Sequence, residues 1–73
     1  MFERVRKILA NYTDLPAAKI MESSTLMGDL DLNSLDIINI VMDFEDEFGI
    51  EIDDEEIRKL VTVGDIVQYM ENY

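Results

Sequence analysis

The sequence predicts an all-α fold: a small four-helix bundle with a short third helix and a long loop between the first two helices. Two observations support this prediction. Apolar residues recur at steps of three and four along most of the chain, and helix-capping signals divide it into segments. The one alternating stretch, Ile50-Glu51-Ile52, is too short for a strand. A chain of 73 residues has enough apolar side chains for one core, so we expect a single domain over residues 1–73.

The first helix is expected over about residues 2–13, where the apolar stripe consists of Phe2, Val5, Ile8, Leu9 and Tyr12. Pro16 lacks an amide hydrogen and disfavours helix at the preceding residue, so the helix has to end before it. Residues 15–33 then form a long connection. Loops of this length are usually functional or held by apolar contacts, and we expect Leu26 and Leu30 to hold this one against the core.

The second helix is expected from Asn33 to about Phe48. Asn33 suits the N-cap position, and Asp36 three residues later completes a variant of the capping box. Gly49 is typical of the residue that ends a helix.

Two shorter helices are expected after it. The third begins at Asp53 or Asp54 and ends near Leu60. The fourth begins at Thr62, which forms a second capping signal with Asp65. Its apolar stripe consists of Val63, Ile66, Val67 and Met70.

The second helix carries more apolar residues than one buried face needs. At about 100° per residue, one arc holds a normal core face, made of Ile37, Ile40, Val41, Phe44 and Phe48. A further apolar strip continues past it and consists of Leu35, Ile38 and Met42. We expect part of this strip to be exposed, with Ser34 at its N-terminal end and Glu45 on the same edge. Exposed apolar groups rimmed by charge often mark a protein interface.

The charge is strongly negative and unevenly distributed. Six basic residues face seventeen acidic ones, a net charge of −11, and residues 21–57 hold thirteen acids and no base. Nucleic-acid backbones and anionic membranes need a cationic face, so neither is expected as a partner. No apolar run approaches the ~18 residues of a membrane span, and the first residues lack the apolar core of a signal peptide. We therefore expect a soluble, cytoplasmic, monomeric protein. Its acidic segment either binds a basic partner or only keeps the domain soluble.

The composition excludes several kinds of chemistry. The chain has no cysteine and no histidine, so disulfides, thiolate ligands and an imidazole base are absent. Ser34 has no base to activate it as a nucleophile, and we expect no enzyme. Asp29, Asp31 and Asn33 match the first, third and fifth ligands of a calcium-binding EF-hand loop. Ser34 and Ile40 stand where that loop needs glycine and glutamate, so no metal site is expected.

Ser34 is the residue for which the sequence still suggests a chemical role. At the first turn of a helix its hydroxyl lies near uncompensated amides, where a phosphate ester is stabilised. The alternative is that Ser34 only helps to cap the helix.

A family resemblance supports the phosphate-ester interpretation. Asp29-Leu30-Asp31-Leu32-Asn33-Ser34-Leu35-Asp36, followed by Phe44-Glu45-Asp46-Glu47-Phe48-Gly49-Ile50-Glu51-Ile52, resembles the acyl carrier proteins of bacterial fatty acid synthesis, over nearly the whole chain. The resemblance implies that Ser34 carries 4′-phosphopantetheine, transferred from coenzyme A by a phosphopantetheinyl transferase. The thiol of that arm holds acyl groups as thioesters, so the protein is a carrier and not an enzyme.

The resemblance also implies partner and pocket residues. Four acids of the second helix match positions that meet basic patches on acyl-transfer and chain-elongation enzymes: Asp36, Glu45, Asp46 and Glu47. Leu35, Ile38 and Met42 match the positions of apolar partner contacts near the arm. The positions that line the acyl pocket match Leu26, Ile52, Ile57 and Leu60, which on a purely structural interpretation are core residues.

Five residues depart from the usual pattern of the family. Before the serine, Asn33 replaces the usual aspartate and Asp31 replaces a common glycine. Farther along the chain, Asn39 replaces an acid, Asp53 replaces a proline, and Ile57 replaces a small residue. They leave open whether the acyl groups belong to fatty acids, a specialised lipid or a polyketide. The alternative function is a non-covalent acidic adaptor or inhibitor of a basic protein, which needs no chemistry at Ser34.

Overall fold

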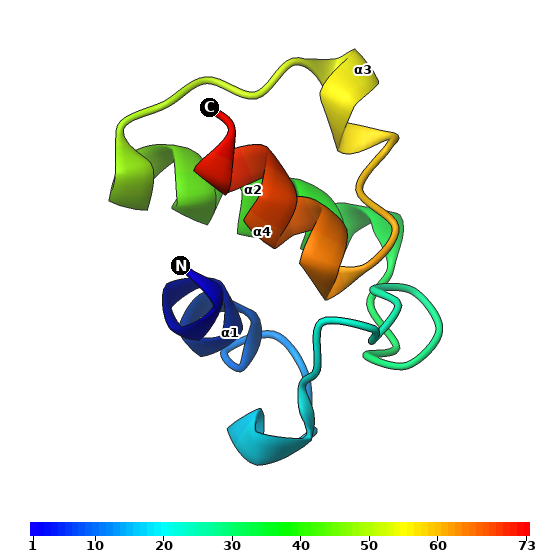
Figure 1. Cartoon of the computed structure of the whole chain (residues 1–73). Coiled ribbons are helices and arrows are strands. Elements are labelled where there is room, and N and C mark those ends of the chain that lie inside the picture. Colours follow the sequence, from blue (N-terminus) through cyan, green and yellow to red (C-terminus); the bar gives the residue numbers. More distant parts are fainter.

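A computed structural model describes all of residues 1–73 and contains four α-helices (Figure 1). They are α1 (Phe2–Leu9), α2 (Ser34–Phe48), α3 (Asp54–Ile57) and α4 (Val63–Glu71). A single 3₁₀ turn, η1 (Ala17–Lys19), which the sequence analysis did not predict, lies in the long loop. No strand is present, so the all-α bundle with a short third helix is confirmed. α1 packs against both α2 and α4, and α3 lies to one side of them (Figure 1).

α1 is shorter than predicted, because regular helix ends at Leu9 and not near residue 13. The apolar stripe nevertheless continues, and Tyr12 packs on the core. The amides of Asn11 and Tyr12 bond to carbonyls three residues back, at 3.1 and 2.9 Å. The chain therefore tightens into 3₁₀-type turns that keep the apolar spacing while ending the α-helical bonding.

α2 begins and ends at the predicted residues. The Asn33 side chain accepts a hydrogen bond from the Asp36 amide at 2.8 Å, and Asp36 Oδ2 accepts one from the Asn33 amide at 3.2 Å. The predicted capping box is thus confirmed. Gly49 ends the helix with φ 65°, a left-handed conformation that glycine adopts without a Cβ penalty.

α3 is one short turn after an N-cap, Asp53, whose side chain makes no capping bond. Beyond Ile57 the chain continues in turns, with the amides of Lys59 and Leu60 bonded three residues back. The sequence predicted a helix that ends near Leu60. The chain does turn as far as Leu60, but regular α-helix ends at Ile57.

α4 begins with the second predicted capping box. Thr62 Oγ1 accepts from the Asp65 amide at 3.1 Å, while Asp65 Oδ2 accepts from the amides of Thr62 and Val61, both at 3.0 Å. These backbone hydrogen bonds to Thr62 and Val61 lower the pKa of Asp65 below its usual value, because they favour the charged carboxylate.

The long loop is fixed to the core and to the start of α4. Leu26 and Leu30 are both 2% exposed, as predicted. The Val63 amide bonds to the Ser24 carbonyl at 2.9 Å, and the Gly64 amide bonds to the Glu22 carbonyl at 2.8 Å. A Cβ on residue 64 would lie 3.1 Å from the Glu22 carbonyl oxygen. A glycine there allows the loop backbone to approach this closely.

α1 is also joined to the C-terminal half of α2. Arg4 lies 3.1 Å from Glu47, and its guanidinium stacks 4.3 Å from the ring centre of Phe48. The Tyr12 hydroxyl donates a hydrogen bond to Asp43, which raises the pKa of Tyr12 above its usual value. None of the helices combines the length and hydrophobicity needed to cross a membrane.

Candidate functional site

Ser34 is the first residue of α2 and is exposed to solvent. Its hydroxyl makes no hydrogen bond, because the neighbouring Asn33 provides the helix cap. The alternative in which Ser34 itself caps the helix is therefore wrong. The other serines differ from it in place: Ser24 is buried and accepts a bond from the Met21 amide at 3.0 Å, and Ser23 lies in the loop. Ser34 thus presents an uncommitted hydroxyl at a helix N-terminus.

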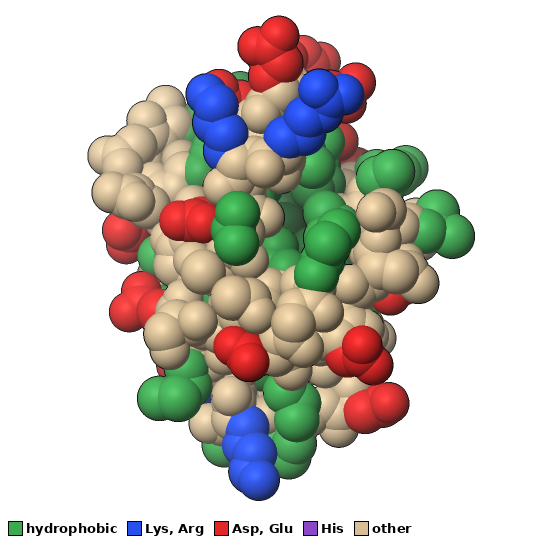
Figure 2. Space-filling model, turned by 90° about the vertical axis from the view of Figure 1, so that its right-hand side faces the viewer, with side chains coloured by type: hydrophobic (Ala, Val, Ile, Leu, Met, Phe, Trp, Pro, Cys, Tyr) green, Lys and Arg blue, Asp and Glu red, His purple; other side chains and the backbone are tan.

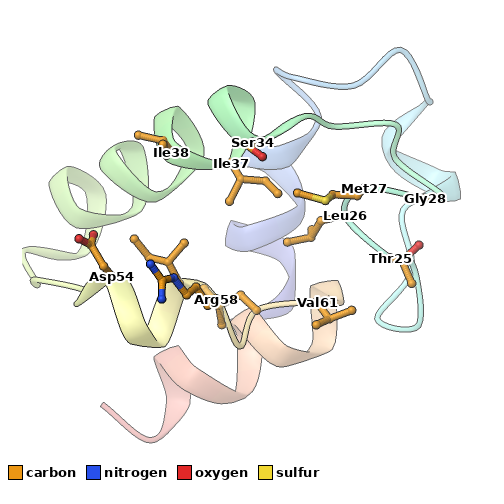
Figure 3. A pocket seen from close by; sticks show the side chains of 12 residues that line it. Thr25, Leu26, Met27, Gly28, Ser34, Ile37, Ile38, Asp54, Arg58 and Val61 are labelled. Atoms are coloured by element: carbon orange, nitrogen blue, oxygen red, sulfur yellow. The ribbon is translucent and has the colours of Figure 1, made fainter.

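An apolar pocket of about 600 Å³ opens beside Ser34. α2 contributes Ser34, Ile37 and Ile38, and the long loop contributes residues 25–28. The opposite wall comes from α3 and the turns after it. Figure 2 shows the pocket as a hollow with hydrophobic side chains around it and two cationic side chains above it. In Figure 3, Ser34 and Ile38 lie across the pocket from Asp54 and Arg58.

Three of the four predicted pocket residues line this pocket: Leu26, Ile57 and Leu60. Ile52 does not, and is buried in the core instead. Three further lining residues were not predicted from the sequence: Met27, Val61 and Arg58. Met27 and Val61 are large apolar residues outside the helices, more than half exposed, and no helical pattern could have placed them beside Ser34. Arg58 could have been noticed as the first basic residue after the acidic segment.

The apolar strip on α2 is exposed as predicted. Leu35, Ile38 and Met42 are 66%, 50% and 56% exposed. Ile38 also lines the pocket. The strip therefore begins beside Ser34 and continues along the outer face of α2.

The four acids predicted for partner binding are not equivalent. Asp36 belongs to the capping box, Glu45 accepts a hydrogen bond from the Ile52 amide at 2.8 Å, and Glu47 pairs with Arg4. Asp46 is exposed and forms no ion pair or hydrogen bond through its side chain. The sequence predicted the capping role of Asp36, but it could not distinguish Glu45 and Glu47, which bond within the chain, from Asp46.

The calcium-like stretch has structural roles. Asp29 Oδ2 accepts from the Thr25 amide at 3.0 Å, Asn33 caps α2, and Asp31 adopts a left-handed φ of 55°. No group of three acidic side chains is arranged to hold a metal ion.

The chain is similar to known proteins over nearly its whole length. The model of the family described as "Phosphopantetheine attachment site" matches residues 3–70. The chain is 41% identical over 71 residues to the acyl carrier protein of Thermotoga maritima, covering 97% of this chain and 88% of that protein. The acyl carrier protein of Zymomonas mobilis is also 41% identical, with 97% and 91% covered. The chain belongs to the acyl carrier protein family.

The fold comparison agrees. The solved structure of the acyl carrier protein from Enterococcus faecalis, described for its high thermal stability, superposes with a TM-score of 0.81. It is 36% identical, with 94% of this chain and 87% of that chain covered. Acyl carrier proteins have phosphopantetheine as their covalent cofactor, and they are carriers and not catalysts. The sequence-based prediction of family, cofactor and carrier role is thus confirmed.

Proposed function

We propose that Ser34 is the attachment site for phosphopantetheine and that the arm carries acyl groups as thioesters. The single observation that carries this assignment is the free hydroxyl of Ser34 at the first position of α2. The helix N-terminus favours the negative charge of the phosphodiester that forms there.

The attachment needs an external enzyme, because the chain has no histidine or cysteine to act as a base or nucleophile. In the transfer, Ser34 Oγ attacks the phosphorus of coenzyme A that bears the pantetheine. A new Oγ–P bond forms, the pyrophosphate P–O bond breaks, and adenosine 3′,5′-bisphosphate leaves. The hydroxyl proton passes to a base of the transferase. The thiol at the far end of the arm then forms the thioester.

The pocket beside Ser34 suits the acyl end of this cargo. A methylene group in water costs about 0.8 kcal/mol relative to an apolar site, and the wall includes Leu26, Ile57 and Leu60. Ile57 is half-buried and lies on the wall opposite Ser34. The cargo is therefore expected to fold back from Ser34 between α2 and α3.

The exposed edge of α2 is the docking surface for the transferase and for acyl-transfer and chain-elongation enzymes. The apolar strip of Leu35, Ile38 and Met42 supplies the contact area, and the net charge of −11 attracts basic patches. Of the acids on this edge, Asp46 has no partner within the chain. Its charge is therefore the one most available to attract the basic patch of a partner enzyme. The protein works as a cytoplasmic monomer in fatty acid synthesis or a related lipid or polyketide pathway.

Intact-mass measurement tests the attachment. After incubation with coenzyme A and a broad-specificity transferase, the wild type is expected to gain one phosphopantetheine mass and Ser34→Ala none. Ser23→Ala removes another exposed serine and is expected to load like the wild type. Loading of Ser34→Ala would assign the arm to another residue. An unloaded wild type would instead favour a non-covalent acidic adaptor.

A second experiment tests the docking surface. Asp46→Lys is expected to slow association with the transferase, most strongly at low salt, because exposed charges act on the on-rate. Asp14→Lys makes the same charge change at an exposed residue after α1 and is the matched control. Met42→Ala is expected to raise the off-rate, since it removes apolar contact. Equal association rates for Asp46→Lys and Asp14→Lys across ionic strengths would mean that only the overall charge of the protein, and not Asp46 itself, affects association.

A further inference from the structure

The pocket beside Ser34 contains one cation, Arg58. Seven of its twelve lining residues are hydrophobic, and Asp54 is the one acid among them. Arg58 follows the C-terminal end of α3 and lines the pocket on the wall opposite Ser34, with its guanidinium on the side of Asp54 (Figure 3). An arm anchored at Ser34 that folds across the pocket therefore brings the far end of its cargo toward this guanidinium.

Arg58 has no partner within the chain. Arg4 pairs with Glu47, Arg6 with Glu3, and Lys59 with Glu56. Asp54 stands four residues before Arg58 on the same turn, a spacing at which ion pairs form readily, yet no ion pair or side-chain hydrogen bond joins the two. In a chain with seventeen acids, the guanidinium beside the pocket is thus left with all its donors free.

The chemistry of the pocket limits what pairs with Arg58. A hydrocarbon end would contact the apolar wall and leave the guanidinium unused. A carboxylate at the end of the cargo would accept two parallel hydrogen bonds from the guanidinium fork. Elsewhere on a chain of net charge −11, such a carboxylate would be repelled. Arg58 is the one lining side chain whose charge attracts a carboxylate.

We propose that this pocket holds acyl groups that end in a carboxylate, which pairs with Arg58. This specificity rests on the proposed attachment of the arm to Ser34. Arg58 acts on the choice of cargo and takes no part in attaching the arm.

The test compares two acyl groups with the same number of carbons. A transferase loads the full-length protein from glutaryl- or pentanoyl-coenzyme A, and intact mass checks the loading. The glutaryl group ends in a carboxylate and the pentanoyl group in a methyl. Melting temperatures are measured at pH 7 and low salt for the wild type and for Arg58→Gln. Arg58 is exposed and unpaired, so the unloaded variant is expected to melt like the unloaded wild type.

In the wild type, the glutaryl form is expected to melt at least as high as the pentanoyl form. In Arg58→Gln the glutaryl form is expected to melt lower, so that the difference between the two cargoes changes by roughly 2–5 °C. This change is expected to shrink at 0.5 M salt, about the level at which exposed ion pairs are screened. The pKa of the cargo carboxyl, followed by carbon-13 NMR, is expected to be lower in the wild type than in Arg58→Gln.

Lys59→Gln is the matched control. It removes the same charge from the next residue, but Lys59 does not line the pocket and lies 3.6 Å from Glu56. Lys59→Gln is expected to keep the wild-type difference between the two cargoes. If it loses the difference as Arg58→Gln does, only net charge is involved and the proposal is overturned.

Two further outcomes overturn the proposal and are distinguishable. If Arg58→Gln lowers the melting temperature of both loaded forms equally, Arg58 pairs with the phosphate of the arm and not with the cargo. If the wild type gains no mass, the attachment at Ser34 fails, and the cargo specificity fails with it. A loaded wild type with equal cargo differences in all variants rejects the specificity alone.

Discussion

The starts of α2 and α4 are built alike and used differently. Each has a two-way capping box, Asn33 with Asp36 and Thr62 with Asp65. The first residue inside α4 is Val63, which is fully buried, whereas the first residue inside α2 is the exposed Ser34. The same local motif therefore serves the core in one helix and presents a reactive hydroxyl in the other.

The surroundings of the two starts explain the difference. The backbone of residues 22–26 pairs with the first turn of α4 and covers it. No comparable pairing covers the start of α2, whose next residue, Leu35, is 66% exposed. A capping box therefore fixes where a helix begins but not which side of that beginning meets solvent.

The largest expected effect compares apolar residues on the two helices. Ile66 on α4 is 2% exposed, whereas Ile38 on α2 is 50% exposed. Ile66→Ala is expected to cost about 2–5 kcal/mol of unfolding free energy, because it leaves a cavity. Ile38→Ala is expected to stay within about 0.5 kcal/mol. Urea unfolding of both variants measures the difference, and similar losses would mean that the strip on α2 is covered in solution.

An intermediate effect separates the two caps. Thr62→Ala and Asn33→Ala are each expected to cost about 1 kcal/mol, since each removes a capping bond. Only Asn33→Ala is expected to slow the loading of Ser34, because it frees the turn that positions the hydroxyl. Asn33→Asp keeps an oxygen acceptor and is expected to restore both properties. Unchanged loading in Asn33→Ala would show that the transferase itself orders this turn.

The smallest expected effect is the pH dependence of the cap at α4. The pKa of Asp65 is lowered in the folded protein, so its stabilising contribution is present above the unfolded pKa, 3.8. It is lost as the pH falls through the folded pKa. The stability advantage of the wild type over Asp65→Asn is therefore expected to be largest near neutral pH and to shrink below about pH 4. Thermal unfolding at several pH values measures it, and an advantage independent of pH would contradict the assignment.

The site was predicted unevenly from the sequence. Ser34 and the exposed strip of Leu35, Ile38 and Met42 followed from one helix, since helical periodicity and a local cap fix their relative directions. The roles of the acids did not follow, because Glu45 and Glu47 bond to residues distant in sequence, Ile52 and Arg4. Ile52, which the family resemblance placed in the acyl pocket, does not line the pocket beside Ser34.

The sequence by itself determined the number of helices, both capping boxes, the glycine that ends α2 and the exposed serine beside an apolar strip. These features depend on interactions within about four residues, which the sequence states directly. Only the tertiary structure decided that α1 tightens after Leu9 and that the long loop pairs with the start of α4. It alone placed Met27, Val61 and Arg58 around one pocket with Ser34. Those arrangements depend on how segments far apart in the chain share one small core, and no local pattern specifies that packing.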